Sequence, residues 1–149
     1  MKKVVLILLM LTCLAVVVEA AEGTYAEEEV VSLCNEIRQE YGLPPLIKNW
    51  EVARVARYKT EDMKSHGYFS HDSPTYGSFF DMLNNFHIPY RSAGENIAMG
   101  FTTPQTVVDA WMASPSHRKN ILSPSFTQAG VGYSADGTVH YWALILLED

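Results

Sequence analysis

The feature that most constrains the fold is a pair of strand-like segments near the carboxyl end of the chain. Residues 129–133 and 139–146 are rich in small, aromatic and aliphatic residues, and Ala135-Asp136-Gly137 between them is typical of a hairpin turn. An antiparallel pair of this kind has to bury at least one face against other elements. The rest of the chain must therefore supply a cover for a small sheet.

The sequence before this hairpin predicts four helices. A helix begins at Glu27 and ends at Gly42, and its acidic start suits the helix dipole. The other three are expected at residues 49–66, 78–85 and 103–114, the last starting at Thr103-Pro104. Helices followed by an antiparallel sheet indicate a single α+β domain.

The second predicted helix has a clear division of side chains. Its cap residue is Asn49, and Gly67 ends it. The predicted apolar face consists of Trp50, Ala53, Ala56, Thr60 and Met63. The charged residues of the same helix are expected to face water: Arg54, Lys59, Glu61, Asp62 and Lys64.

The first twenty residues have the pattern of a secretory signal peptide. Met1-Lys2-Lys3 is basic, residues 4–18 are apolar, and Val18-Glu19-Ala20 predicts cleavage after Ala20. The apolar run is shorter than the roughly 20 residues that a spanning helix needs. We therefore expect a secreted protein with no membrane span after cleavage, a short lead-in at residues 21–29 and one domain at residues 30–149.

Charge and cysteine content narrow the function classes. The chain has a formal net charge of −6, which gives no electrostatic attraction to nucleic acid, so a DNA or RNA partner is not expected. Only Cys34 follows the predicted cleavage site, so the mature chain has no intramolecular disulfide. Cys34 lies among apolar residues of the first helix and is predicted to be buried. We expect a monomer held together by packing alone.

Three segments place titratable side chains between apolar elements, where we expect loops. They are Tyr68-Phe69-Ser70-His71-Asp72-Ser73-Pro74, Ala93-Gly94-Glu95-Asn96-Ile97-Ala98 and Ser114-Pro115-Ser116-His117-Arg118-Lys119-Asn120-Ile121-Leu122. Two neutral imidazoles and a carboxylate are ligands that zinc accepts. Without a metal, imidazoles and a carboxylate can instead act as a proton-transfer set.

Together and in this order, the three segments resemble the bacterial branch of the CAP family, the SCP-like extracellular domains. The similarity extends from about Val30 to Leu146 and includes Trp111 and Tyr141-Trp142. It implies a three-layer α–β–α sandwich with a central antiparallel sheet and an open cleft. It also implies that His71, Glu95 and His117 meet in that cleft, where some members of the family bind a divalent metal such as zinc.

Other interpretations of these residues stay open at this point. Glu95 can cap loop amides or pair with Arg118, and His117 can cap a helix or fix a loop. No second cleft acid is assigned, and Ala143-Leu144 stand where bacterial relatives commonly have Thr-Gln, which removes polar groups from a strand beside the cleft.

Three functions compete. The first is an extracellular binding module for a lipid, peptide or cell-wall fragment, with or without a metal. The second is a hydrolase that uses a metal-bound or histidine-activated water. The third is an interaction protein with a vestigial cleft. No serine-hydrolase elbow and no HExxH motif is present in the sequence, which favours a binding module.

Overall fold

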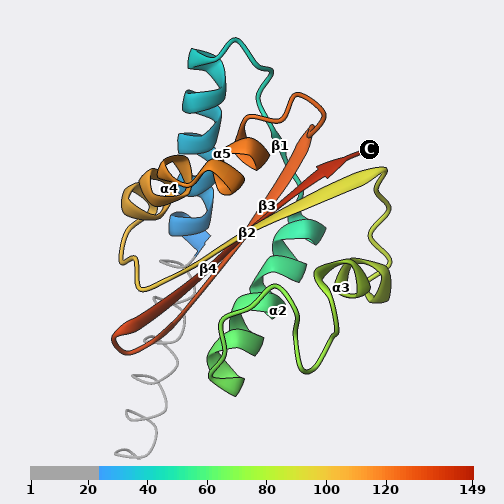
Figure 1. The fold of residues 1–149 in the computed structure, drawn as a ribbon, viewed down its shortest axis with the longest axis vertical. Helices are drawn as coiled ribbons and strands as arrows, with labels where there is room; N and C mark the ends of the chain where they lie inside the picture. The colour runs from blue at the N-terminus through green and yellow to red at the C-terminus, as the bar shows by residue number, and fades with distance from the viewer. Residues whose placement is uncertain (1–23) are drawn as a thin grey trace, which may run out of the picture.

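The computed structural model describes residues 24–149, and the predicted signal peptide lies outside them (Figure 1). Residues 24–40 form the first helix. The other helices are α2 (Trp50–His66), α3 (Phe79–Asn85), α4 (Pro104–Ala113) and α5 (Pro115–Ile121). The strands are β1 (Ile47–Lys48), β2 (Ser92–Met99), β3 (Gln128–Asp136) and β4 (Val139–Glu148).

The four described strands form one sheet in the order β1-β3-β4-β2. The predicted hairpin is confirmed: β3 and β4 pair antiparallel, with Asp136 opposite Val139. β2 pairs antiparallel with the other side of β4 and is an edge strand. The two-residue strand β1, which the sequence did not predict, adds a parallel pairing to β3.

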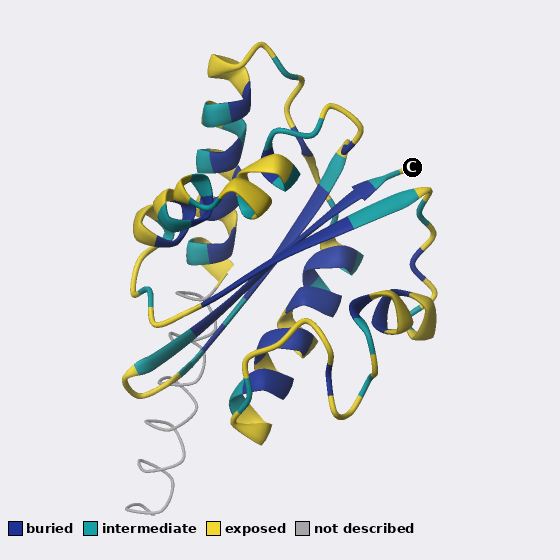
Figure 2. Ribbon diagram, in the orientation of Figure 1, coloured by how far each residue is buried: buried dark blue, intermediate teal, exposed yellow. Residues whose placement is uncertain are grey.

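Helices cover both faces of this sheet, so the predicted three-layer α–β–α sandwich is confirmed (Figure 1). Alternate residues of β4 point to opposite layers, as a strand with period two requires. Trp142, Leu144 and Leu146 pack with the first helix, α4 and α5. Ala143, Ile145 and Leu147 pack with α2 and α3. Figure 2 shows the burial concentrated along the sheet and on the helix sides that face it.

The helix ends follow the sequence signals closely. The Asn49 side chain accepts from the amides of Glu51 and Val52, and Gly67 ends α2 in the left-handed conformation with φ of 63°. Thr103 caps α4 before Pro104. The predicted apolar face of α2 is wrong at one position, because the Trp50 side chain is 72% exposed. Trp50 is the first residue of the helix, and its side chain lines two surface cavities.

Two glycines of β3 allow α2 to lie directly on the sheet. A Cβ on Gly130 would lie 2.2 Å from the backbone nitrogen of Ala53, and one on Gly132 would lie 2.2 Å from the carbonyl carbon of Ala56. Any side chain at these positions would overlap the helix backbone. The close packing of α2 against β3 fixes the position of the layer from which part of the site is built.

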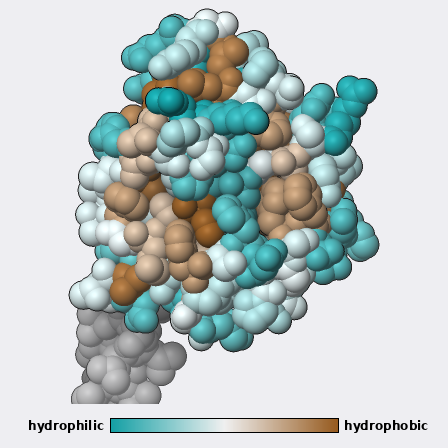
Figure 3. Space-filling model, viewed as in Figure 1, coloured by the Kyte–Doolittle hydropathy of each residue, from teal (hydrophilic) through white to brown (hydrophobic). Residues whose placement is uncertain are grey.

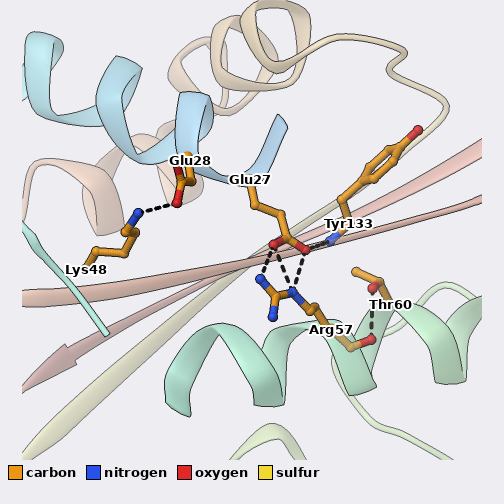
Figure 4. A network of polar contacts seen from close by, with 6 residues as sticks. All are labelled: Glu27, Glu28, Lys48, Arg57, Thr60 and Tyr133. Atoms are coloured by element: carbon orange, nitrogen blue, oxygen red, sulfur yellow. Dashed lines mark hydrogen bonds and ion pairs between the residues drawn. The ribbon is translucent and has the colours of Figure 1, made fainter. Parts of the chain in front are cut away.

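The segment expected to be a lead-in takes part in the fold. Residues 24–29 already belong to the first helix. The buried Glu27 carboxylate receives a bidentate interaction from the Arg57 guanidinium of α2, with one Nε–Oε1 distance of 2.9 Å, and accepts from the Tyr133 amide at 3.1 Å (Figure 4). The first helix therefore starts earlier than predicted because Glu27 has partners in both α2 and β3.

The described helices are short, and the visible surface is mixed in hydropathy. None of the described helices is long and apolar enough to cross a membrane. On the face that Figure 3 presents, apolar residues form separate patches among hydrophilic ones.

Cys34 is fully buried, as predicted, and burial raises the pKa of its thiol to about 12.

Candidate functional site

The structure corrects where two of the three candidate residues lie. Glu95 is in the edge strand β2, and His117 is in the short helix α5, although both were expected in loops. Only His71 lies in a segment without regular secondary structure, between α2 and α3. β2 and α5 were missed because Gly94, Glu95 and Asn96 interrupt a strand-like alternation, and α5 consists mainly of polar residues.

His71 and Glu95 form a direct pair. The Nδ1 atom of His71 lies 2.7 Å from Oε1 of Glu95. The Glu95 side chain is buried, whereas that of His71 is 55% exposed. Because Nδ1 engages the carboxylate, Nε2 is the ring nitrogen left for a ligand. A carboxylate that holds an imidazole in this way fixes the orientation of the ring.

Glu95 and Asn96 point to opposite layers because they are adjacent in a strand. Glu95 is opposite Ile145, whose side chain faces α2 and α3, and Asn96 is opposite Leu144, which faces the other layer. On that side the Asn96 amide donates to the carbonyl of His117 at 3.0 Å. One edge strand thus holds a residue of the α2–α3 loop on one face and α5 on the other.

Two further residues fix α5 beside β2. The Asn120 amide donates to Oδ1 of Asn96 at 2.8 Å. The buried Arg38 guanidinium, from the first helix, donates to the carbonyls of Ile121 at 2.9 Å and Ser123 at 2.8 Å. These bonds hold the carboxyl end of α5, and the Asn96 bond to the His117 carbonyl holds its middle, so the position of α5 is set by β2 and by the first helix.

The two imidazoles have opposite electrostatic environments. The hydrogen bond with Glu95 raises the pKa of His71 above its usual value, against the effect of partial burial. Partial burial lowers the pKa of His117, and the charge of His71 lowers it further. His71 is therefore the first of the pair to gain a proton as pH falls, and its charge acts on His117 across the edge of β2.

Lys59 and Asp62 are two residues of this region that the sequence analysis placed wrongly. Both were expected to face water, but Lys59 is 0% exposed and Asp62 is 6% exposed. The Lys59 ammonium donates to the carbonyl of His71 at 2.8 Å. Burial lowers the pKa of Lys59, while the nearby Glu95 and Asp62 carboxylates favour its charged form. Lys59 thus ties the His71 segment to α2.

Asp62 organises the remainder of the same segment. Its carboxylate accepts hydrogen bonds from the hydroxyls of Tyr68, Ser73 and Thr75, each at 2.5 Å. Burial acts to raise the pKa of Asp62, but these bonds outweigh it and hold the pKa below its usual range. The signal for both buried charges was present in the spacing, because Lys59 and Asp62 follow the apolar Val55 by four and seven residues and share its helix face. Their charges masked it.

The three-ligand metal set of His71, Glu95 and His117 stays a prediction. Among the described residues, no three His, Cys, Asp or Glu side chains are grouped so that they can hold a metal ion. In the structure, Glu95 bonds Nδ1 of His71. The donor chemistry fits a set of two imidazoles, with Glu95 behind one of them, a relation that metal-ligating histidines commonly have.

Comparison with known proteins identifies the fold and its family. The model of the cysteine-rich secretory protein family, CAP, matches residues 31–146. The chain belongs to the CAP family. The structure of an extracellular protein containing an SCP domain from Bacillus anthracis is similar, with a TM-score of 0.80 and 34% identity over 85% of this chain and 41% of that chain. The resemblance seen in the sequence is thereby confirmed.

Other similarities extend the comparison to curated relatives and to a further solved structure. The uncharacterized protein YkwD of Bacillus subtilis is 54% identical over 113 residues, which are 76% of this chain and 44% of that protein. The chain spans less than half the length of the two curated CAP relatives that it matches, one of which is named as a membrane protein. The structure of NaASP2 with Zn²⁺ shares the CAP fold, with a TM-score of 0.60 and 13% identity over 81% of this chain and 78% of that chain.

Proposed function

We propose that this chain is an exported CAP-domain binding module whose site presents the Nε2 atom of His71 and the side chain of His117 to an extracellular ligand. The observation that carries this proposal is the 2.7 Å contact between His71 Nδ1 and the buried Glu95. It turns an exposed imidazole into an oriented donor, which is a feature of binding sites and is not required for packing.

The electrostatics favour an oxygen-rich ligand group. The raised pKa of His71 keeps its ring protonated closer to neutral pH, so that Nε2 donates a hydrogen bond. His117 has a lowered pKa and stays neutral, so one of its nitrogens can accept. A carboxylate or carbonyl oxygen next to a hydroxyl or amide matches this donor and acceptor. Among the ligand classes expected from the sequence, a peptide-bearing cell-wall fragment matches best.

A divalent metal is the second occupant to consider at the same site. His71 Nε2 and one nitrogen of His117 would hold it, and solvent or ligand would complete the four-coordinate shell that zinc prefers. A bound zinc ion would polarise a ligand oxygen. Zinc affinity is expected to fall as pH decreases, because a protonated imidazole cannot bind a metal.

Hydrolysis is the alternative that one observation favours. The pKa values of His71 and His117 shift in opposite directions, as those of paired catalytic acids and bases do. Against it, the buried Cys34 thiol is protonated, with a pKa of about 12, and the Lys59 ammonium is bonded within the fold. A hydrolase built on this site would therefore have to use water as its nucleophile.

Co-sedimentation with purified bacterial cell-wall sacculi tests the proposal, in EDTA and in added zinc. The test variant is the double substitution His71→Gln with His117→Gln. The control is Glu40→Gln, which changes an exposed residue of the first helix that lies outside both the His71 segment and α5. We expect the double variant to lose most of the retention and the control to keep it.

Each outcome of that experiment has a clear meaning. Equal retention of the double variant and the unsubstituted protein would overturn the proposed site. Retention by vesicles of anionic phospholipid, and not by sacculi, would overturn the ligand class. Release of soluble fragments from sacculi by the unsubstituted protein, and not by the double variant, would establish the hydrolase instead. Binding only in the presence of zinc would show that the metal completes the site.

A further inference from the structure

A second concave surface lies at the opposite end of α2 from the His71 segment. A cavity of about 430 Å³ opens between the start of α2, the turn that follows α3 and the ends of β3 and β4. Its wall includes Trp50, Arg54, His87, Gln128 and Asp149. Trp50 precedes Lys59, the contact of His71, by nine residues of helix, which is about 13 Å along the axis. The cavity is therefore separate from the site described above.

Trp50 is the most informative residue of this surface. Its side chain is 72% exposed at the first position of α2, whereas Trp111 and Trp142 are buried in the core. Trp50 also lines a second cavity of about 310 Å³, so it belongs to the walls of both hollows. A large exposed indole between two hollows offers a flat apolar face to a ligand, and the fold gains little from it.

Polar side chains with planar groups line the cavity beside this indole. The Asn49 amide donates to the Gln128 side chain, and the Gln128 amide donates to the Asp149 carboxylate. On the other wall, Arg54 pairs with Glu51 at 2.6 Å and lies over the ring of Phe86 at 5.3 Å. These side chains are held in place by one another, and they come from α2 and from the start of β3 and the end of β4.

The backbone on the third side is held in an unusual conformation. His87 has a φ of 56° and is the one non-glycine residue with positive φ among residues 24–149. The bonds from the His87 amide to Asn84 and from the Ile88 amide to Leu83 hold this turn closed. The left-handed residue directly follows the C-cap Phe86 and ends α3, so it fixes the direction of the chain along this wall of the cavity.

From this combination, we propose that the cavity beside Trp50 binds a neutral oligosaccharide. One face of a pyranose ring is made of C–H groups that stack on an indole, and its hydroxyls bond to planar amide, carboxylate and guanidinium groups. The lining carboxylates of Glu51 and Asp149 face a single guanidinium, that of Arg54, so an anionic ligand would be repelled. An apolar peptide would leave this polar wall without partners.

Binding of chitotriose and of maltotriose to the purified chain tests the proposal by calorimetry and tryptophan fluorescence. Because Trp111 and Trp142 are buried, a fluorescence change on adding sugar reports on Trp50. We expect saturable binding of at least one trisaccharide with a blue shift. Trp50→Ala is expected to weaken it by about tenfold, and Trp50→Phe by less, since a ring remains. The exposure of Trp50 means that neither change should impair folding.

Matched variants separate this site from its neighbours. Arg54 lines only this cavity and Lys48 only the second one, so Arg54→Ala should weaken binding and Lys48→Ala should not. Ile47→Ala, an exposed apolar residue that lines neither, should bind as the unsubstituted chain does. His71→Gln should also leave sugar binding unchanged, so failure here is distinguishable from failure of the proposed function. No saturable signal with either sugar, or equal affinity of Trp50→Ala, would overturn the proposal.

Discussion

Individual charged residues of α2 determine how well the His71 segment is held. Lys59 and Asp62 are buried under that segment. Lys59 donates a hydrogen bond to the His71 carbonyl, and Asp62 accepts one from the Ser73 hydroxyl. The sequence predicted His71, Glu95 and His117 as candidates, and the structure pairs the first two. The sequence did not reveal that Lys59 and Asp62 are buried, because a charged residue on a helix is usually solvated. Only the tertiary structure shows which charges are paired in the interior.

Removing the Asp62 carboxylate is predicted to destabilise the fold. Asp62→Ala leaves the buried Ser73 hydroxyl, the half-buried Tyr68 hydroxyl and the Thr75 hydroxyl without their acceptor, at a cost of about 2–3 kcal/mol in urea unfolding. Because the folded pKa of Asp62 is lowered, its contribution is present above the unfolded value of 3.8 and is lost as pH falls through the folded pKa.

Asp109→Ala is the matched control for that change. Asp109 is an exposed acid of α4 that accepts only from the Gln105 side chain, so its removal should change stability by less than about 0.5 kcal/mol. Similar losses in the two variants would mean that the network around Asp62 contributes no more than a solvated carboxylate does.

At the scale of elements, the sequence predicted the starts of helices best where a capping side chain marks them. The caps Asn49, Ser78 and Thr103 each begin the helix that was predicted there. β2 and α5 were not predicted, because β2 holds the polar pair Glu95-Asn96 and α5 has a single fully buried residue, Ile121. Both elements are specified by contacts with distant segments, and both contribute directly to the site.

Helix α4 provides a test of the predicted core. Trp111 is 1% exposed, and its indole nitrogen donates to the carbonyl of Ile97 in β2 at 3.2 Å. Trp111→Ala should therefore cost roughly 3–5 kcal/mol, the usual range for a buried aromatic residue. Trp50→Ala, at an exposed indole, should cost less than about 1 kcal/mol in the same denaturant melts. Equal losses would contradict the placement of α4 against the sheet.

At the scale of the whole molecule, the sandwich brings together residues that no local pattern connects. His71 and His117 belong to opposite layers, and β2 holds both, His71 through Glu95 and the His117 carbonyl through Asn96. The family resemblance named these residues together in the sequence, whereas spacing alone did not. The direction of Glu95 towards His71 follows from the strand register, which the sequence did not reveal.

Export is the prediction that concerns the whole chain in its cell. If residues 1–20 are a cleaved signal, protein recovered from the growth medium should begin at Ala21 or within a few residues of it. N-terminal sequencing of that protein provides the measurement. Recovery of the chain in the membrane fraction with Met1 intact would contradict export by cleavage.

The pairing of His71 with Glu95, and its effect on His117, is tested most directly by the pH titration of both imidazoles in one sample by NMR, after EDTA treatment. We expect His71 to titrate above the ordinary value of 6.5 and His117 below it. Glu95→Gln should lower the pKa of His71. Since the folded pKa of His71 is raised, the stability that the pair contributes should be complete below about pH 6.5 and be lost as pH rises through that folded pKa. A His117 that titrates at or above His71, or a His71 pKa unchanged by Glu95→Gln, would contradict the site described here.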